Sequence, residues 1–167
     1  MLITRRAALL ASSAALILPA AAQSADTVRI GLIAPMTGPF TSTGKVMAAG
    51  ARLYMQQKGD TVAGKKIQLI LKDDSGNADT AKRIAQEMVV SGEANILAGF
   101  GLTPIALAVA PVATEAKVAQ VVMLAATPIV TDRSPMIVRV SFTTAQTTVP
   151  IAEWSLKAGI KIGRAHV

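Results

Sequence analysis

Residues 99–104, GFGLTP, carry the spacing that most directly suggests ligand chemistry in this chain. Gly99 and Gly101 begin like a dinucleotide-binding fingerprint, but the third glycine of that pattern would fall at position 104, which is Pro104. Proline is favoured in the first turn of a helix, where free backbone N–H groups and the helix dipole attract an anion. With the Thr103 hydroxyl, such a helix start suffices to hold a single carboxylate, so a nucleotide is disfavoured.

A second loop with ligand-binding groups spans residues 123–135, MLAATPIVTDRSP. Ala125 offers only backbone groups, whereas Thr127 offers a hydroxyl that both donates and accepts. A carbonyl and a hydroxyl suit an ammonium group, beside N–H groups that suit a carboxylate. The two loops together are suited to a zwitterion, although ordinary loop packing explains the same residues equally well.

The loop 34–45, APMTGPFTSTGK, also contains several hydroxyl groups. Neither Gly38 nor Gly44 precedes the Lys-Ser/Thr pair that a phosphate-binding P-loop requires. An ordinary strand-to-helix turn is the competing explanation of this composition.

Residues 73–80, DDSGNADT, alternate oxygen-bearing side chains in the manner of a calcium loop. That loop requires glycine at its sixth position and a bidentate glutamate at its twelfth. Here Gly76 stands fourth and Ile84 twelfth. We therefore expect no metal site, but a turn followed by a helix that Asn77 or Asp79 caps.

Catalytic groups are scarce in the chain. The single histidine, His166, lies in the last six residues, and there is no cysteine. Asp73 and Asp74 are sequence neighbours and are not expected to face each other as an acid–base pair. No nucleophile–base pair can be named, so we predict a binding protein without a cofactor and not an enzyme.

The two ends of the chain predict segments outside the folded domain. Residues 1–22 place Arg5 and Arg6 before an apolar stretch and small residues, the order of a secretory signal peptide cleaved after Ala22 or within residues 22–25. The apolar run is shorter than the roughly 20 residues of a membrane span. Twin-arginine export remains an alternative to the general secretory route.

Residues 162–167, IGRAHV, can be encoded by a widely used sequencing-adapter sequence. We expect these residues to derive from an adapter and the natural protein to continue beyond residue 161; a genuine C-terminus is the alternative. Residues 23–161 would then be an incomplete N-terminal lobe. Without Arg5, Arg6 and Arg164, the formal net charge falls from +7 to +4. The remaining lysines form no basic block interleaved with aromatics, so we expect no nucleic-acid partner.

Short apolar segments alternate with longer segments of helical spacing along residues 28–158. The predicted strands are 28–34, 66–72, 94–100, 119–124 and 136–141, and the predicted helices are 44–58, 79–90, 102–116 and 146–158. We expect the first helix to bury Val46, Met47, Gly50, Leu53 and Tyr54, and the second to bury Ala81, Ile84, Ala85, Met88 and Val89. This order predicts an α/β fold: a parallel sheet with helices on both faces and ligands at the carboxyl ends of the strands.

Four segments in this order resemble the periplasmic substrate-binding proteins of branched-chain amino acid ABC transporters, the Leu/Ile/Val-binding type with a type I periplasmic-binding-protein fold. They are VRIGLIAPMTGPFTSTGKVMAAGARL, GKKIQLILKDDSGNADTAKRIAQEMV, ILAGFGLTPIALAVAPVA and VVMLAATPIVTD, within residues 26–161. The resemblance implies the first of two lobes that close on a ligand and a permease in the inner membrane that recognises closure. It also implies a periplasmic location.

The resemblance also implies binding residues for the amino-acid head group of the ligand. These would be Thr103, the Ala125 backbone and Thr127, with backbone of Gly101 and Leu102 in close approach. The family often places an aromatic in the first loop, where this chain offers Phe40. The family's usual Ser/Thr cluster is reduced here to Thr103, which leaves the register around residues 101–104 and the ligand side chain open.

Three functions follow as hypotheses. The first is a binding component that delivers branched-chain amino acids or similar small carboxylates to an ABC permease. The second is a ligand-sensing domain of the same fold, and the third is a Rossmann-like enzyme, which Pro104 disfavours. Because the chain ends near the expected crossing to the second lobe, we expect weak or no ligand binding by it alone, and micromolar affinity for leucine would contradict this.

Overall fold

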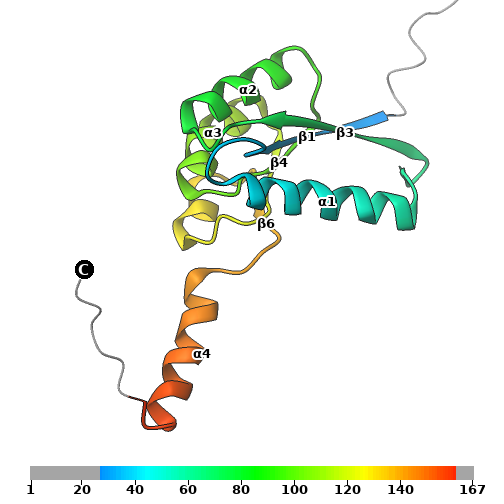
Figure 1. Cartoon of the computed structure of the whole chain (residues 1–167). Helices are drawn as coiled ribbons and strands as arrows, with labels where there is room; N and C mark the ends of the chain where they lie inside the picture. Colours follow the sequence, from blue (N-terminus) through cyan, green and yellow to red (C-terminus); the bar gives the residue numbers. More distant parts are fainter. Residues whose placement is uncertain (1–26, 161–167) are drawn as a thin grey trace, which may run out of the picture.

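Residues 27–160 are described by the computed structural model of the chain, and they alternate strand and helix as the sequence predicts (Figure 1). The predicted signal peptide, residues 1–22, and the predicted adapter-derived tail, residues 162–167, lie outside the described residues. The strands are β1 (Thr27–Ala34), β2 (Thr61–Val62), β3 (Lys65–Asp73), β4 (Ile96–Gly99), β5 (Ala119–Val122) and β6 (Ile137–Arg139). The helices are α1 (Thr41–Lys58), α2 (Ala78–Val90), α3 (Thr103–Ala116), the short 3₁₀ helix η1 (Pro128–Arg133) and α4 (Thr144–Lys157).

One six-stranded sheet forms the centre of the molecule, in the order β2-β3-β1-β4-β5-β6. Every neighbouring pair is parallel except β2 with β3, which forms a short antiparallel edge. The predicted parallel α/β fold is therefore confirmed, with β2 and η1 as two elements that the sequence did not predict. Gly99 pairs with Val122, and Val122 pairs with Arg139. The carboxyl ends of β4, β5 and β6 thus meet at one edge of the sheet.

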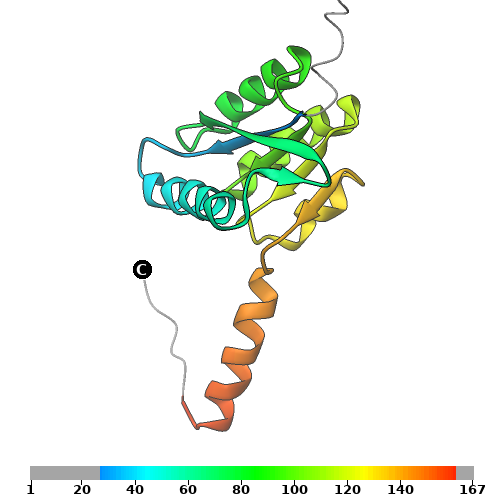
Figure 2. The ribbon, with the colours of Figure 1, turned by 90° about the vertical axis from the view of Figure 1, so that its right-hand side faces the viewer.

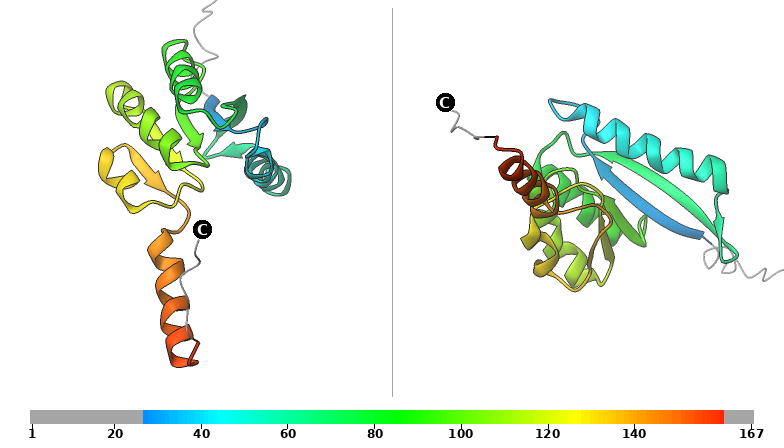
Figure 3. Two further views of the ribbon diagram at one scale, coloured as in Figure 1. Left: turned by 60° about the vertical axis from the view of Figure 1, so that its left-hand side comes forward. Right: turned by 90° about the horizontal axis from the view of Figure 1, so that it is seen from below.

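The sheet has α1 on one face and α2 with α3 on the other (Figure 3). Alternation along each strand explains the two layers, because successive side chains point to opposite faces. Leu32 and Ala98 are buried with Ala48 of α1, whereas Ile33 and Leu97 are buried in the larger cluster with α2 and α3. The predicted buried face of α2 is confirmed for Ala81, Ile84, Ala85 and Met88, with Val89 half-buried.

The predicted buried face of α1 is wrong for most of its members. Val46, Gly50, Leu53 and Tyr54 are exposed, while Gly44 and Met47 are buried against the protein. Gly44 explains the rotation, because a methyl group at that position would lie 2.0 Å from the Pro35 carbonyl oxygen. The helix packs Gly44 against the preceding loop, a steric requirement that hydrophobic periodicity does not record.

Helix α4 is confirmed as a helix but does not cover the sheet, as the two-faced arrangement had implied. It projects away from the sheet and its other helices (Figures 1 and 2). Ser155 is its one buried residue, while large apolar side chains such as Trp154 and Leu156 are exposed. Thr143 and Gln146 form a capping box that starts the helix locally. Over the described range, no helix combines the length and apolarity needed to cross a membrane.

Candidate functional site

The candidate site lies at the carboxyl edge of β4, β5 and β6, where two predicted loops meet. The turn after β4 carries Gly99, Phe100 and Gly101, and the loop after β5 carries Ala125 and Thr127. In open parallel sheets this edge is the usual place for a ligand, because the helix N-termini point toward it. The structure brings together the two loops that the sequence singled out.

The glycines of the first turn serve packing. Gly99 has φ of +114°, and a methyl group there would lie 2.0 Å from the Ile33 carbonyl oxygen of β1. A methyl group on Gly101 would lie 3.1 Å from the Thr43 side chain and 3.3 Å from that of Met47, so this residue approaches α1 closely. Close packing therefore explains the two glycines of the Gly-x-Gly pattern, and no bound phosphate is needed to explain them.

Phe100 stands between these glycines in the left-handed region, with φ of +62°, and its side chain is fully buried. A bulky residue rarely adopts this conformation, which costs about 1–3 kcal/mol and persists only where the surroundings enforce it. The Phe100 N–H donates to Ile33, and its carbonyl accepts from the Ala125 N–H at 3.1 Å. The turn is thereby fixed both to β1 and to the second loop.

Helix α3 starts at this turn without a side-chain cap. Its N-cap residue is Leu102, which has no acceptor, and Pro104 occupies the first turn as predicted. The N–H groups of the first turn have no partner within the helix, so they and the helix dipole favour a negatively charged group. Thr103, the first residue of the helix, is half-buried beside them.

The two predicted threonines form a hydroxyl pair. Thr103 Oγ1 lies 2.7 Å from Thr127 Oγ1 across 24 residues of sequence, and either oxygen can be the donor. One hydroxyl donates within the pair, and the other remains able to donate to a ligand oxygen. The pair therefore adds a hydrogen-bond donor to the uncapped start of α3.

The segment that carries Thr127 is held from three directions besides this pair. The Ala125 N–H donates to Phe100, and the Thr144 N–H at the start of α4 donates to the Ala126 carbonyl at 3.0 Å. The guanidinium of Arg139 donates through Nη2 to the Thr127 carbonyl. Ala125 itself is 2% exposed, so its side chain belongs to the core, and its N–H is already bonded to Phe100.

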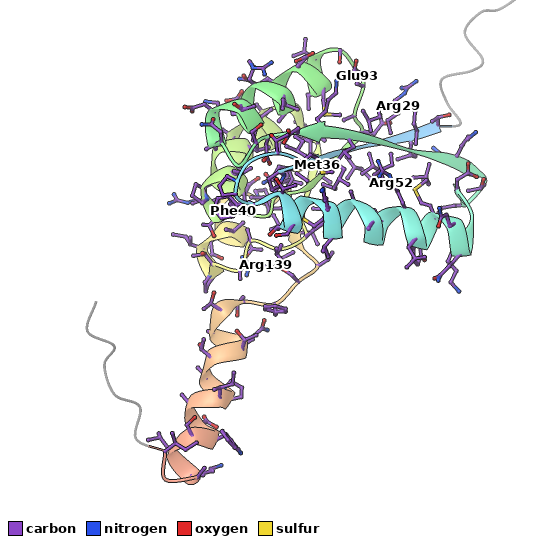
Figure 4. The ribbon with its side chains drawn as sticks, in the orientation of Figure 1. Arg29, Met36, Phe40, Arg52, Glu93 and Arg139 are labelled. Atoms are coloured by element: carbon purple, nitrogen blue, oxygen red, sulfur yellow. The ribbon has the colours of Figure 1, made fainter. Side chains whose placement is uncertain are left out.

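Arg139 is the site residue that the sequence analysis missed. Arg139 lies within the predicted strand 136–141, and its only signal in the sequence was a cation in an apolar strand, which Lys72 also provides in the strand 66–72. Its Nε is buried without a hydrogen-bond partner among residues 27–160. Arg139 and Phe40 lie toward the same end of the molecule, whereas Arg52 lies farther along α1 (Figure 4).

Phe40 and Leu102 form an apolar part of the same edge. A methyl group placed on Gly76 would lie 3.0 Å from the Phe40 ring and 3.9 Å from a Leu102 methyl, so both side chains border this glycine. Phe40 is 41% exposed at the N-cap of α1. The predicted aromatic is therefore close to the start of α3, with its ring partly free.

The neighbouring carboxylates Asp73 and Asp74 hold the loops and do not face each other. Asp73 Oδ1 accepts from the N–H groups of Met36 and Ser75, each at 2.8 Å, and from that of Thr37. Its Oδ2 accepts from the Thr37 hydroxyl at 2.6 Å. Desolvation opposes ionisation, but these donors outweigh it and lower the pKa of Asp73 to about 2.

Asp74 lies in the opposite environment. It is fully buried, its Oδ1 accepts from the Gly76 N–H at 2.8 Å, and its Oδ2 has no partner among the described residues. Burial, and to a smaller extent the charge of Asp73, raises the pKa of this carboxyl. Asn77 caps α2 by accepting from the Thr80 N–H, as one of the two predicted alternatives.

Known proteins are similar to this chain in sequence and in fold. The family described as "Periplasmic binding protein" matches residues 27–163. The chain is 41% identical over 145 residues to Leu/Ile/Val-binding protein homolog 6 of Brucella abortus (strain 2308), an alignment that covers 86% of this chain and 37% of that protein. The chain thus spans little more than a third of the length of this relative.

Two solved structures extend the similarity to ligand complexes. A solute binding protein of an ABC transporter from Rhodopseudomonas palustris BisB5, in complex with 3,4-dihydroxybenzoic acid, matches at 56% identity and a TM-score of 0.80, covering 81% of this chain and 38% of that one. A solute binding protein of an ABC transporter from Rhodopseudomonas palustris HaA2, in complex with p-hydroxybenzoic acid, matches at 41% identity and a TM-score of 0.77, covering 80% and 37%.

Proposed function

The chain belongs to the periplasmic binding protein family, and we propose that it supplies one wall of the ligand cleft in the solute-binding component of an ABC importer. The observation that carries this proposal is the Thr103–Thr127 hydroxyl pair at the uncapped start of α3. A small carboxylate suits this arrangement, because hydroxyl and backbone N–H groups at the same helix start can both donate to its oxygens. Membership of a family of binding proteins supports binding and not catalysis as the role.

We propose aromatic carboxylates as the preferred ligands, ahead of the branched-chain amino acids expected from the sequence. The 56% identical R. palustris protein was solved with 3,4-dihydroxybenzoic acid, whereas the 41% identical relative carries a Leu/Ile/Val-binding name. Both ligand classes share the carboxylate that the hydroxyl pair would hold. The half-exposed Phe40 ring and Leu102 offer an apolar surface on which an aromatic ring can stack.

The remaining parts of the proposal concern location and delivery. A signal peptide over residues 1–22 would export the protein to the periplasm, where it would pass its ligand to a permease in the inner membrane. Residues 23–161 would form the N-terminal lobe, and residues 162–167 would be adapter-derived. These assignments follow from the sequence pattern and from the family, which is named for periplasmic proteins.

Protein-observed NMR of the 167-residue chain tests the site itself. Titration with 4-hydroxybenzoate is expected to shift the amide signals of Gly101, Thr103 and Thr127, with millimolar affinity because one wall makes only part of the contacts. Leucine is expected to shift the same signals less. T103V should abolish the shifts, while T61V, which changes an exposed threonine in β2, should leave them intact.

The proposal fails if neither ligand shifts these amides up to tens of millimolar. It also fails if the shifts gather elsewhere in the chain. Equal shifts in T103V and in the unmodified chain would exclude the hydroxyl pair as the carboxylate-binding group.

A further inference from the structure

Arg139 is fixed against the loop that carries one of the two ligand-facing hydroxyls. It lies in register with Val122 of β5, so both side chains leave the sheet on the same face. Val122 belongs to the core cluster under α3, which places Arg139 on the face of the sheet from which α3 begins. Its Nη2 donates to the carbonyl of Thr127, whose hydroxyl contacts Thr103.

This guanidinium is the one charged partner of the segment 125–127 within the described part of the chain. The other groups bonded to that segment are the backbone of Phe100, Val130 and Thr144 and the hydroxyls of Thr103 and Thr144. Arginine stays protonated at every physiological pH, so its positive charge is permanent. Half-burial weakens solvent screening of this charge relative to a fully exposed side chain.

The Arg139 Nε is buried without a hydrogen-bond partner among residues 27–160. A buried donor without a partner is costly, and a charged one more so. The position is therefore poorly explained by structural support alone, because a single hydrogen bond to a carbonyl does not require a full guanidinium. A positive potential at the hydroxyl pair would explain why a charged residue occupies this position.

Resting on the proposed function, we propose that Arg139 makes this site selective for ligands with a net negative charge, carboxylic acids that lack an ammonium group. Arg139 acts as a positioning residue for Thr127 and adds a positive potential where the ligand carboxylate binds. A monoanion gains from this potential, whereas a zwitterion gains at its carboxylate and loses at its ammonium. The same reasoning disfavours a neutral amide of identical shape.

Two ligands of similar shape, one anionic and one neutral, separate the electrostatic role from loop support. The 167-residue chain is titrated by NMR with 4-hydroxybenzoate and with 4-hydroxybenzamide, in the unmodified form and as R139K, R139Q and R52Q. Arg52 is an exposed arginine of α1 and provides the matched control. Far-UV circular dichroism melts establish that each variant is folded, and each titration is repeated at low and high salt.

We expect the unmodified chain to bind the carboxylate with about tenfold higher affinity than the amide, because one interaction with a charged group is typically of this size. R139Q should lose that preference and most of its salt dependence, R139K should retain most of both, and R52Q should match the unmodified chain. An R139Q variant that keeps the preference overturns the inference. Equal losses of affinity for both ligands, or an R139K variant that binds no better than R139Q, also overturn it. Arg139 would then have a structural role only.

The same data distinguish this inference from the proposed function. If no ligand shifts the Thr103 and Thr127 amides of the unmodified chain, the proposed site itself is wrong. If 4-hydroxybenzoate binds there and R139Q binds it equally well, the site stands and the role of Arg139 is wrong.

Discussion

Ionised Asp73 should stabilise the fold by linking the loop after β1 to the loop after β3. Four donors converge on its carboxylate: the N–H groups of Met36, Thr37 and Ser75 and the Thr37 hydroxyl. D73N keeps the shape of the side chain but replaces one acceptor oxygen with a donor, which faces the Thr37 hydroxyl. We expect D73N to be less stable at neutral pH and to hold the Phe40 loop less firmly.

The magnitude follows from the lowered pKa. A folded-state pKa of about 2, against 3.8 for the free side chain, corresponds to about 2.4 kcal/mol at roughly 1.4 kcal/mol per pH unit. Because the carboxylate is only half-buried, solvent screening reduces this contribution to about 1 kcal/mol. The pKa is lowered on folding, so the stabilisation is complete above pH 3.8 and disappears as the pH falls through 2.

Urea denaturation followed by far-UV circular dichroism between pH 2 and 7 measures this contribution. Trp154 fluorescence is unsuitable, because that residue is exposed on the projecting helix α4. The free energy of unfolding of D73N should lie about 1 kcal/mol below that of the unmodified chain at pH 7 and converge with it near pH 2. D132N, which changes an exposed aspartate in η1, is the control. A D73N deficit that stays constant from pH 7 to pH 2 would refute the ionic origin.

Three further substitutions test other parts of the structure. D74N should be at least as stable as the unmodified chain at pH 7. Burial raises the pKa of Asp74, so the stability contributed by its protonated form is present below pH 3.8 and is lost as the pH rises through the folded-state value. A destabilised D74N in urea titrations would contradict this. G99A should lower the free energy of unfolding by about 3 kcal/mol or more, since φ at this position is +114° and the new methyl group would lie 2.0 Å from the Ile33 carbonyl oxygen. G50A, in open space on α1, should raise the free energy of unfolding by about 0.5–1 kcal/mol. Thermal melts that fail to separate the two variants would exclude the clash. T103V should change the melting temperature little, because the half-buried Thr127 hydroxyl can bind water, while abolishing the ligand-induced amide shifts.

The fold was largely predictable because parallel strands and amphipathic helices leave strong periodic signals. The α2 face, with Ile84 and Met88, emerged from spacing alone. The α1 face did not, since Gly44 must meet Pro35 and this contact overrides the apolar residues at Val46 and Leu53. Periodicity reports where side chains prefer to lie, but not where the backbone must approach another segment.

The candidate site was predictable in its residue types more than in its connections. Thr103 and Thr127 attracted attention because each follows a predicted strand, and strand ends meet at one edge in a parallel sheet. Arg139 lies inside the predicted strand 136–141, where a lone arginine outside any motif gives only a weak signal of a binding role. Its bond to the Thr127 carbonyl depends on the β5–β6 register, and that register is a tertiary property.

The turn GFG shows how a packing requirement can place a binding group. Gly99 exists because β1 passes too close for a side chain, and Phe100 takes a left-handed conformation that turns the chain sharply at the end of β4. That sharp turn starts α3 directly at the sheet edge, with the aliphatic Leu102 as N-cap and no side chain to occupy its first N–H groups. A serine or aspartate at position 102 would cap the helix and compete with a ligand carboxylate for the same donors. Substitution L102D should therefore weaken 4-hydroxybenzoate binding, and an L102D chain that binds the ligand unchanged would show that these N–H groups are not part of the site.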